Sequence, residues 1–255
     1  MVTSPSPSPE SRFSSRVENY IRYRPSYPPQ VIQLLLSEAS LDRSSRVADI
    51  GSGTGIFTQM LLAAGCTVFG VEPNADMRAA AERLLGRNPR FISIGAPAQA
   101  TTLEDHTVDL ITAAQAFHWF DTPETRQEFP RILSPQGHIA LIWNKRELDT
   151  TPFLRAYEQL LLTYGTDYAR VRHENIDDAR LAQFFPEGYS THEFANAQIF
   201  DFDGLRGRLL SSSYAPEAGH PHYPAMLTAL RELFDTHQAN GTVTFAYTTR
   251  VYLGS

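Results

Sequence analysis

Cysteine is nearly absent from the sequence, since Cys66 is the only one among 255 residues. A single cysteine excludes a disulfide framework and a site built from several thiolates, and it is typical of a reducing compartment. Long apolar runs are also missing: no stretch approaches the roughly 18 residues that cross a bilayer, and the N-terminus has no apolar signal core. The sequence therefore predicts a soluble, cytoplasmic protein without a membrane partner, and it shows no set of metal ligands.

Positive charge is in deficit as well, because 22 Lys and Arg residues stand against 28 Asp and Glu, which leaves a net charge of −6. The basic residues are scattered, so no overall field favours nucleic acid, and no nucleic-acid partner is expected. A length of 255 residues suits one large α/β domain, or one such domain with an inserted cap. The oligomeric state stays open.

Three alternating glycines follow an apolar run at residues 47–50. Gly51, Gly53 and Gly55 come directly after this run, which is typical of a buried strand, and a helical pattern begins at the next residue. Glycine at alternate positions lets the backbone turn sharply and approach a ligand closely, because no Cβ stands in the way. The segment predicts a small-molecule site.

The nature of that molecule follows from what the glycine segment lacks. A dinucleotide fingerprint requires a third glycine where Ile56 stands, and the Lys-Ser/Thr pair of a phosphate-binding loop is missing. A second buried run, residues 68–71, ends at Glu72, whose carboxylate is suited to the two hydroxyls of a ribose. The combination favours a nucleoside without phosphates.

The remaining apolar segments predict the rest of a sheet. Residues 242–253 follow an Asn-Gly turn signal and alternate with a period of two, which indicates a final antiparallel strand. The other strands are expected at residues 91–94, 108–113, 138–143 and 191–202. Helical spacing separates most of them, so the sequence predicts an α/β fold whose seven-stranded, mostly parallel sheet has one antiparallel strand and helices on both faces.

These motifs together resemble the class I S-adenosylmethionine-dependent methyltransferases, in particular the methyltransferase type 11 domain. The likeness covers residues 13–150 well and the rest loosely. It rests, in order, on residues 49–55, on Glu72, and on residues 91–95, 108–111, 115–120 and 133–138. The resemblance implies a Rossmann-like fold with a helical cap inserted after strand five, and S-adenosyl-L-methionine as cofactor.

The resemblance also divides the chain into parts. Ser and Pro alternate from residue 3 to residue 9, which prevents a packed core there. The region after this tail is dense in aromatic and arginine side chains, as in related enzymes that close a lid over the site. The expected parts are a disordered tail at 1–9 and one methyltransferase domain at 10–255, with an N-terminal lid at 10–30, a cofactor-binding core at 44–146, a substrate cap at 147–190, and C-terminal strands and helix at 191–255.

Site residues follow from the same resemblance. Those implied for the cofactor are Asp49, Gly51, Ser52, Gly53, Gly55, Glu72, Pro73, Ala98, Gln99 and Gln115. Those implied for the methyl acceptor are Tyr20, Tyr23, Arg24, Tyr27, His118, Trp119, Arg146, Arg208 and Tyr214. His118 is the candidate catalytic base for an alcohol, a phenol or an activated carbon. The alternative is that His118 and Trp119 only wall the methyl group.

The acceptor is expected to be a small molecule. Residues 115–120 and the Tyr-Arg-Pro string at residue 23 look most like the branch with trans-aconitate methyltransferases, which esterify a polycarboxylic acid, and arginine binds carboxylates in a bidentate way. C-, N- or O-methylation of a natural product is an alternative, as is a non-catalytic nucleoside-binding partner or regulatory protein. A nucleic-acid methyltransferase is disfavoured, because the chain lacks an Asn-Pro-Pro-Tyr type motif after strand four.

Overall fold

The computed structural model describes residues 17–166, 168 and 178–255. The expected tail, the first residues of the expected lid, and residues 167 and 169–177 of the expected cap lie outside the described residues. The helices are α1 (Val17–Tyr23), α2 (Pro29–Glu38), α3 (Ile56–Ala64), α4 (Ala75–Leu85), α5 (Pro123–Ile132), α6 (Pro152–Tyr164), α7 (Asp178–Phe184), α8 (Phe202–Leu210) and α9 (Tyr223–His237), with a 3-10 turn at Phe117–Trp119. The strands are β1 (Arg46–Ile50), β2 (Thr67–Val71), β3 (Phe91–Ile94), β4 (Val108–Ala114), β5 (Leu133–Arg146), β6 (Tyr189–Phe200) and β7 (Val243–Gly254).

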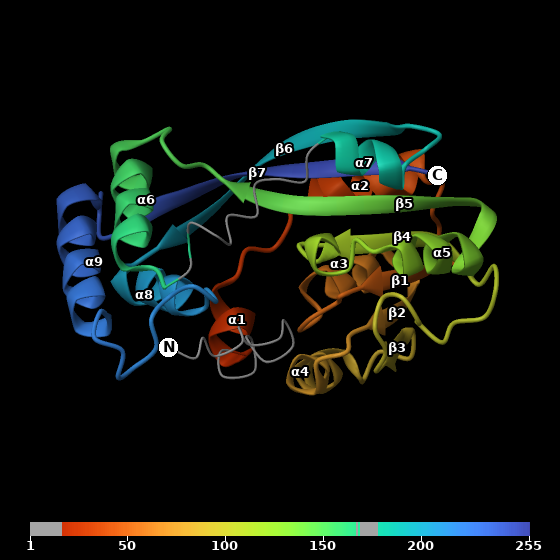
Figure 1. The fold of residues 1–255 in the computed structure, drawn as a ribbon, viewed down its shortest axis with the longest axis horizontal. Coiled ribbons are helices and arrows are strands. Elements are labelled where there is room, and N and C mark those ends of the chain that lie inside the picture. The colour runs from red at the N-terminus through yellow and green to blue at the C-terminus, as the bar shows by residue number, and fades with distance from the viewer. Residues whose placement is uncertain (1–16, 167, 169–177) are drawn as a thin grey trace, which may run out of the picture.

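One seven-stranded sheet organises the chain, in the order β3-β2-β1-β4-β5-β7-β6 (Figure 1). Strand β7 runs antiparallel to both of its neighbours, β5 and β6, and every other pair is parallel. The prediction of a mostly parallel sheet with one reversed strand is confirmed. The helices expected after the fifth strand are present as α6 and α7.

Both faces of the sheet are covered by helices. Because side chains alternate along a strand, Val47 and Ala48 of β1 enter different cores. Helices α2 and α3 pack on the Val47 face, and α5 and α7 pack on the Ala48 face. None of the described helices has the length and apolar character that crossing a bilayer would require.

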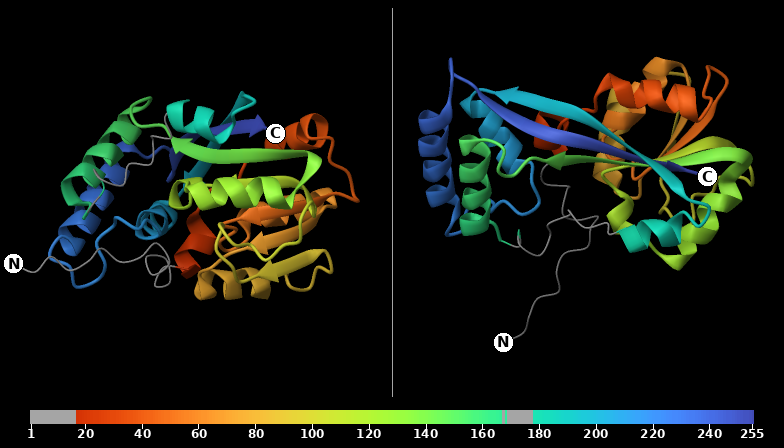
Figure 2. Two further views of the ribbon diagram at one scale, coloured as in Figure 1. Left: turned by 45° about the vertical axis from the view of Figure 1, so that its right-hand side comes forward. Right: turned by 90° about the horizontal axis from the view of Figure 1, so that it is seen from above.

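Strands β5, β6 and β7 are much longer than the others, at 14, 12 and 12 residues. They run beyond the central sheet and carry a third core with α6, α8 and α9, as Figure 2 shows. Phe245 of β7 is fully buried in that core. The site therefore has two walls, one from the central sheet and one from this extension.

The fifth and sixth strands have bounds that differ from the sequence-based expectation. The fifth strand extends past 138–143 at both ends, because its last residues still pair with β7, with Arg146 opposite Tyr247. The sixth strand stops at Phe200 rather than at residue 202, because Asp201 caps a helix, α8, whose presence the pattern did not predict. The Asp201 side chain accepts a hydrogen bond from the Gly204 N–H at 2.8 Å.

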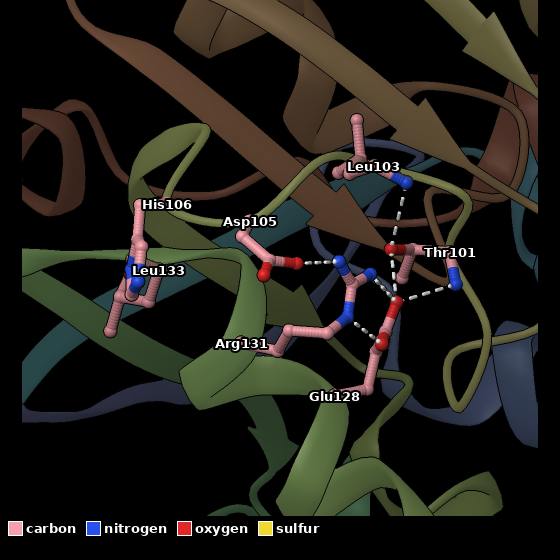
Figure 3. A network of polar contacts seen from close by, with 7 residues as sticks. All are labelled: Thr101, Leu103, Asp105, His106, Glu128, Arg131 and Leu133. Carbon is pink, nitrogen blue, oxygen red and sulfur yellow. Dashed lines mark hydrogen bonds and ion pairs between the residues drawn. The ribbon is translucent and has the colours of Figure 1, made fainter.

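A partly buried ion pair fixes the loop between β3 and β4 (Figure 3). Glu128 of α5 accepts hydrogen bonds from the Thr101 N–H at 2.8 Å and from the Arg131 guanidinium at 2.7 and 2.8 Å. Arg131 in turn donates to Asp105 at 2.6 Å. The hydrogen bonds from Arg131 lower the pKa of Glu128 to about 2, so this carboxylate is ionised wherever the protein is folded near neutral pH. The loop that carries Ala98 and Gln99 is thus attached to α5.

Candidate active site

A cavity of about 270 Å³ lies where the carboxyl ends of β1 and β4 meet the third core. The carboxyl edge of a parallel sheet is the usual ligand site of an open α/β fold. Of the residues predicted from the sequence, the cavity is lined by Tyr20, Arg24, Tyr27, Asp49, Gly51, Ser52, Gly53, Gln115, His118, Trp119, Arg146, Arg208 and Tyr214. Segments from both ends of the chain therefore converge on one space.

The other predicted residues lie outside this lining, and they are Tyr23, Gly55, Glu72, Pro73, Ala98 and Gln99. The ring of Tyr23 packs on α8, so closely that a Cβ on Gly207 would lie 2.1 Å from it. Ala98 is buried in a core beside the sheet, whereas Pro73 and Gln99 are exposed. Glu72 lies directly behind the lining.

The three glycines of the loop after β1 serve different purposes, although all have positive φ, at 68°, 57° and 87°. A Cβ on Gly51 would lie 2.6 Å from the Cβ of Ala116, and a Cβ on Gly55 would lie 2.5 Å from Leu85. A Cβ on Gly53 would meet only the end of Met77, at 3.7 Å. Ala116 therefore blocks a side chain at Gly51, a side chain at Gly55 would have to displace the end of Leu85, and the space beside Gly53 is left for the cavity.

Glu72 holds this loop from behind. Its Oε2 accepts the Gly53 N–H at 2.9 Å, and its Oε1 accepts the Asn74 N–H at 2.8 Å. The side chain of Asn74 caps α4 by accepting from Asp76 and Met77. Glu72 thus joins the glycine loop to the start of α4.

Asp49 forms the floor of the cavity and is only 1% exposed. Its two oxygens accept hydrogen bonds from Thr58 Oγ1 at 2.6 Å and from Thr112 Oγ1 at 2.9 Å. Burial raises the pKa of Asp49 to about 6, and the nearby charge of Glu72 acts in the same direction. A positive charge in the cavity would lower this pKa again, because it favours the carboxylate form.

The turn after β4 places His118 and Trp119 on the cavity wall. Gln115 begins the turn with φ of 60°, which is unusual for a residue other than glycine, and its Nε2 donates to the Asn144 carbonyl at 3.0 Å. Phe117 is fully buried against aromatic rings and anchors the turn. His118 and Trp119 are half-buried, and their ring centroids lie 4.7 Å apart.

Three arginines line the end of the cavity that the third core provides. Arg146 forms an ion pair with Glu158 and donates to Tyr168 Oη at 2.7 Å. Its Nη1 is buried and has no hydrogen-bond partner within the part of the chain that the structure describes. Arg146 is thus balanced by a carboxylate of its own.

Arg24 and Arg208 differ from Arg146 in this respect. Arg208 is 5% exposed and donates to Tyr247 Oη at 3.2 Å and to Ser212 Oγ at 3.0 Å. Arg24 donates to the Ser211 carbonyl at 3.0 Å. Neither is paired with a carboxylate among residues 17–166, 168 and 178–255, and burial together with the charge of Arg208 lowers the pKa of Arg24. Two neighbouring like charges with no carboxylate partner in the described part of the chain favour the binding of an anion.

Sequence reasoning missed several lining residues, namely Trp143, Asn144, Lys145, Tyr168, Asp178, Ser213, Tyr247, Arg250 and Tyr252. The indole N–H of Trp143 is buried and, within the described chain, has no acceptor. Tyr247 could have been found from the sequence, because the alternation of the last strand places it on the same face as the buried Phe245 and Val251. Its position opposite Arg146 depends on strand register, which no local pattern reveals.

Comparisons with known proteins agree on the family. The model of a methyltransferase domain matches residues 48–141. An uncharacterized methyltransferase of Mycobacterium tuberculosis is 38% identical over 230 residues, which are 89% of this chain and 87% of that protein. One of Schizosaccharomyces pombe is 33% identical over 206 residues, 78% of this chain and 77% of the relative. A solved structure from Anaeromyxobacter dehalogenans, named as a candidate type II methyltransferase, covers 91% of this chain and 97% of its own at 21% identity, with a TM-score of 0.65. The chain belongs to the class I S-adenosylmethionine-dependent methyltransferases.

Proposed function

We propose that this methyltransferase transfers the methyl group to a carboxylate oxygen of a small organic acid. The observation that carries the proposal is the pair Arg24 and Arg208, one half-buried and one buried guanidinium that share a cavity with the glycine loop and have no carboxylate partner in the described chain. A carboxylate is the group that matches the planar donor fork of arginine. An acid of the trans-aconitate type fits this description.

The residues around the glycine loop suit S-adenosylmethionine. The open space beside Gly53 admits the nucleoside, Glu72 lies behind it as the carboxylate proposed to bind the ribose hydroxyls, and Asp49 supplies a carboxylate for the positive charges of the cofactor. When bound, the cofactor supplies a methyl group that is already activated for displacement. The enzyme's part is then to align the acceptor and to exclude water.

A carboxylate acceptor has no proton to lose, so the reaction needs no general base. As the acceptor oxygen bonds to the methyl carbon, the bond from that carbon to sulfur breaks and its electron pair stays on sulfur, which leaves a methyl ester and a neutral thioether. In this scheme Arg24 and Arg208 hold and orient the acid, while His118 and Trp119 form a wall that keeps water from the methyl group.

The test compares acceptors and variants in a methyl-transfer assay read by mass shift. Small mono-, di- and tricarboxylic acids, including trans-aconitate, are tested beside their amides and beside phenols, amines and indoles. Arg24→Met and Arg208→Met should each raise KM for an acid at least about tenfold, since hydrogen bonds to charged groups contribute about 1.5–3 kcal/mol. His118→Gln should stay within about threefold of the native rate. Arg22→Met is the matched control, because Arg22 is exposed on α1 and lies over the ring of Tyr23.

A loss of about a hundredfold or more in His118→Gln, with both arginine variants at the native level, would show a proton-bearing acceptor and a catalytic histidine instead. Turnover of phenols or amines but not of acids would favour the natural-product alternative. Tight binding of S-adenosylhomocysteine without turnover on the whole panel would favour the non-catalytic binding protein.

A further inference from the structure

Arg24 stands in a segment that packs at its two ends, where the Tyr23 ring lies against α8 and Tyr27 is buried beside Phe57. Helix α1 has seven residues, none of them fully buried, and its ion pair to α4, between Glu18 and Arg83, is exposed. An isolated helix of this length is unstable in water. Arg24 follows this helix directly, and the like charge of Arg208 opposes its position. Between the two packed ends, further contacts hold the backbone around Arg24.

Three side-chain amides make those contacts. The Ser26 carbonyl accepts two N–H groups, from Asn196 Nδ2 at 2.9 Å and from Asn144 Nδ2 at 3.2 Å. The Tyr23 carbonyl accepts Gln198 Nε2 at 3.1 Å. The two carbonyls flank Arg24 on both sides, so its backbone is attached to strands β5 and β6 through these amides, which we call the amide clamp (Asn144, Asn196 and Gln198).

Gln198 also reaches the second arginine of the anion site. Its Oε1 accepts the Tyr247 hydroxyl at 2.9 Å, and the same hydroxyl oxygen accepts Arg208 Nε at 3.2 Å. One amide therefore joins the backbone beside Arg24 to the side chain that holds Arg208. Because its oxygen and its nitrogen each have the partner that suits them, the arrangement fixes the amide orientation.

Asn144 connects the clamp to the turn after β4. Its Oδ1 accepts from Asn196 Nδ2 at 3.0 Å and from Thr249 Oγ1 at 2.5 Å, and its own carbonyl accepts Gln115 Nε2. With 8% exposure it lies among the cavity walls. The clamp is thus continuous with the turn that carries His118.

We propose that Asn196 and Gln198, supported by Asn144, are positioning residues for the methyl acceptor: they hold Arg24 at a fixed distance from Arg208, so that an anionic group enters a site already assembled. The effect on the acceptor rests on the proposed function, whereas the effect on the N-terminal segment does not. Acceptor affinity should therefore depend on the clamp, while turnover at saturating acceptor should not.

The experiment uses the full chain with Gln198→Met and Asn196→Leu, which keep side-chain size and remove the amide. Gln159→Met is the control, since Gln159 is exposed on α6 and its side chain donates only to Thr163. Hydrogen exchange of residues 17–27 is followed by mass spectrometry with S-adenosylhomocysteine bound. Exchange should accelerate about threefold to tenfold in each clamp variant, the range expected for one lost hydrogen bond, and not in the control. KM for the best acid of the panel should rise by a similar factor, with kcat within about twofold.

A double variant separates a positioning role from general damage. Gln198 also bonds Tyr247, whereas the Asn196 amide bonds the Ser26 carbonyl and Asn144, so the informative pair is Asn196→Leu with Arg24→Met. If Asn196 acts through Arg24, this double variant should have the KM of Arg24→Met alone, and additive effects would overturn the proposal. Native exchange rates in both clamp variants would overturn it as well. Faster exchange with unchanged KM in the clamp variants and in Arg24→Met would support the clamp on the segment and refute the carboxylate acceptor.

Discussion

Asp49 offers the sharpest test of the cofactor site, because its burial imposes a cost that the cofactor would offset. Its pKa of about 6 lies about 2 above the usual 3.8, which corresponds to about 3 kcal/mol for keeping this carboxylate charged in the folded protein. The folded-state value is above the unfolded one, so folding takes up a proton between about pH 4 and pH 6. The stability that this carboxyl contributes is complete below about pH 4 and is lost as the pH rises through about 6.

Asp49→Asn removes the charge and keeps the shape. The amide can accept from one of the two threonines that bind Asp49 and donate to the other. At about pH 8 the variant should therefore be more stable than the native protein, by about 1–3 kcal/mol in urea unfolding, and the difference should vanish towards pH 4. If Asp49→Asn stabilises the protein, the native carboxylate lowers the stability of the fold, which is expected of a residue that is present to bind a ligand.

Cofactor binding should change in the opposite direction. At about pH 5 only about a tenth of the native Asp49 is ionised, so the affinity for S-adenosylmethionine measured by calorimetry should be about tenfold weaker than at pH 7. Asp49→Asn should bind weakly at both values, with no such dependence. A variant that is less stable than the native protein at pH 8, or that retains the pH dependence of binding, would refute this account of Asp49.

Two further predictions concern the elements around the site. Glu128→Gln should cost about 1–2 kcal/mol of unfolding free energy near pH 7, because the pKa of Glu128 is lowered to about 2 and solvent screens part of its interaction with the partly exposed Arg131. This contribution is present above about pH 4.5 and is lost as the pH falls through about 2, so urea unfolding near pH 2 should show a smaller difference. Arg83→Gln, at an exposed ion pair, should change little. Gly53→Ala should fold with about 1–2 kcal/mol of backbone strain and lose cofactor affinity. Gly51→Ala should mainly lose stability, because the new Cβ would clash with Ala116. Calorimetry showing native cofactor binding by Gly53→Ala would mean that the ligand does not approach this backbone.

The features that sequence reasoning captured are those with a local signal. The glycine loop and Glu72 are marked by neighbouring residues, and the reversed last strand is marked by its alternation and by the turn before it. Helix α8 escaped because Gly204 and Gly207 lower its helix propensity. Gly207 is there for a distant reason, since the ring of Tyr23 occupies the space of a side chain. Such a requirement leaves no trace in the surrounding sequence.

The three candidate arginines show the same limit at the site. In the sequence Arg24, Arg146 and Arg208 are equivalent, and only the structure pairs one of them with Glu158 and brings the other two together from almost opposite ends of the chain. Glu158 looks like an ordinary helix residue until α6 packs against β7. Whether an arginine has a carboxylate partner in the described chain depends on tertiary structure. This difference is why Arg24 and Arg208, rather than Arg146, are assigned to the acceptor in our proposal.

The reversed strand explains how one sheet can serve both substrates. The parallel strands end at a common edge and present the glycine loop, Asp49 and the turn with His118 there. Strand β7 runs the other way beside β5, so both continue past that edge and carry Arg146 and Tyr247, as opposite residues, beyond the cofactor region. Strand β6 pairs with the other side of β7, and its amides bond to the segment at residues 23–26, of which Arg24 and Pro25 line the cavity. The proposed acceptor site is therefore built on the extension of the same sheet, and the clamp ties the N-terminal segment to it.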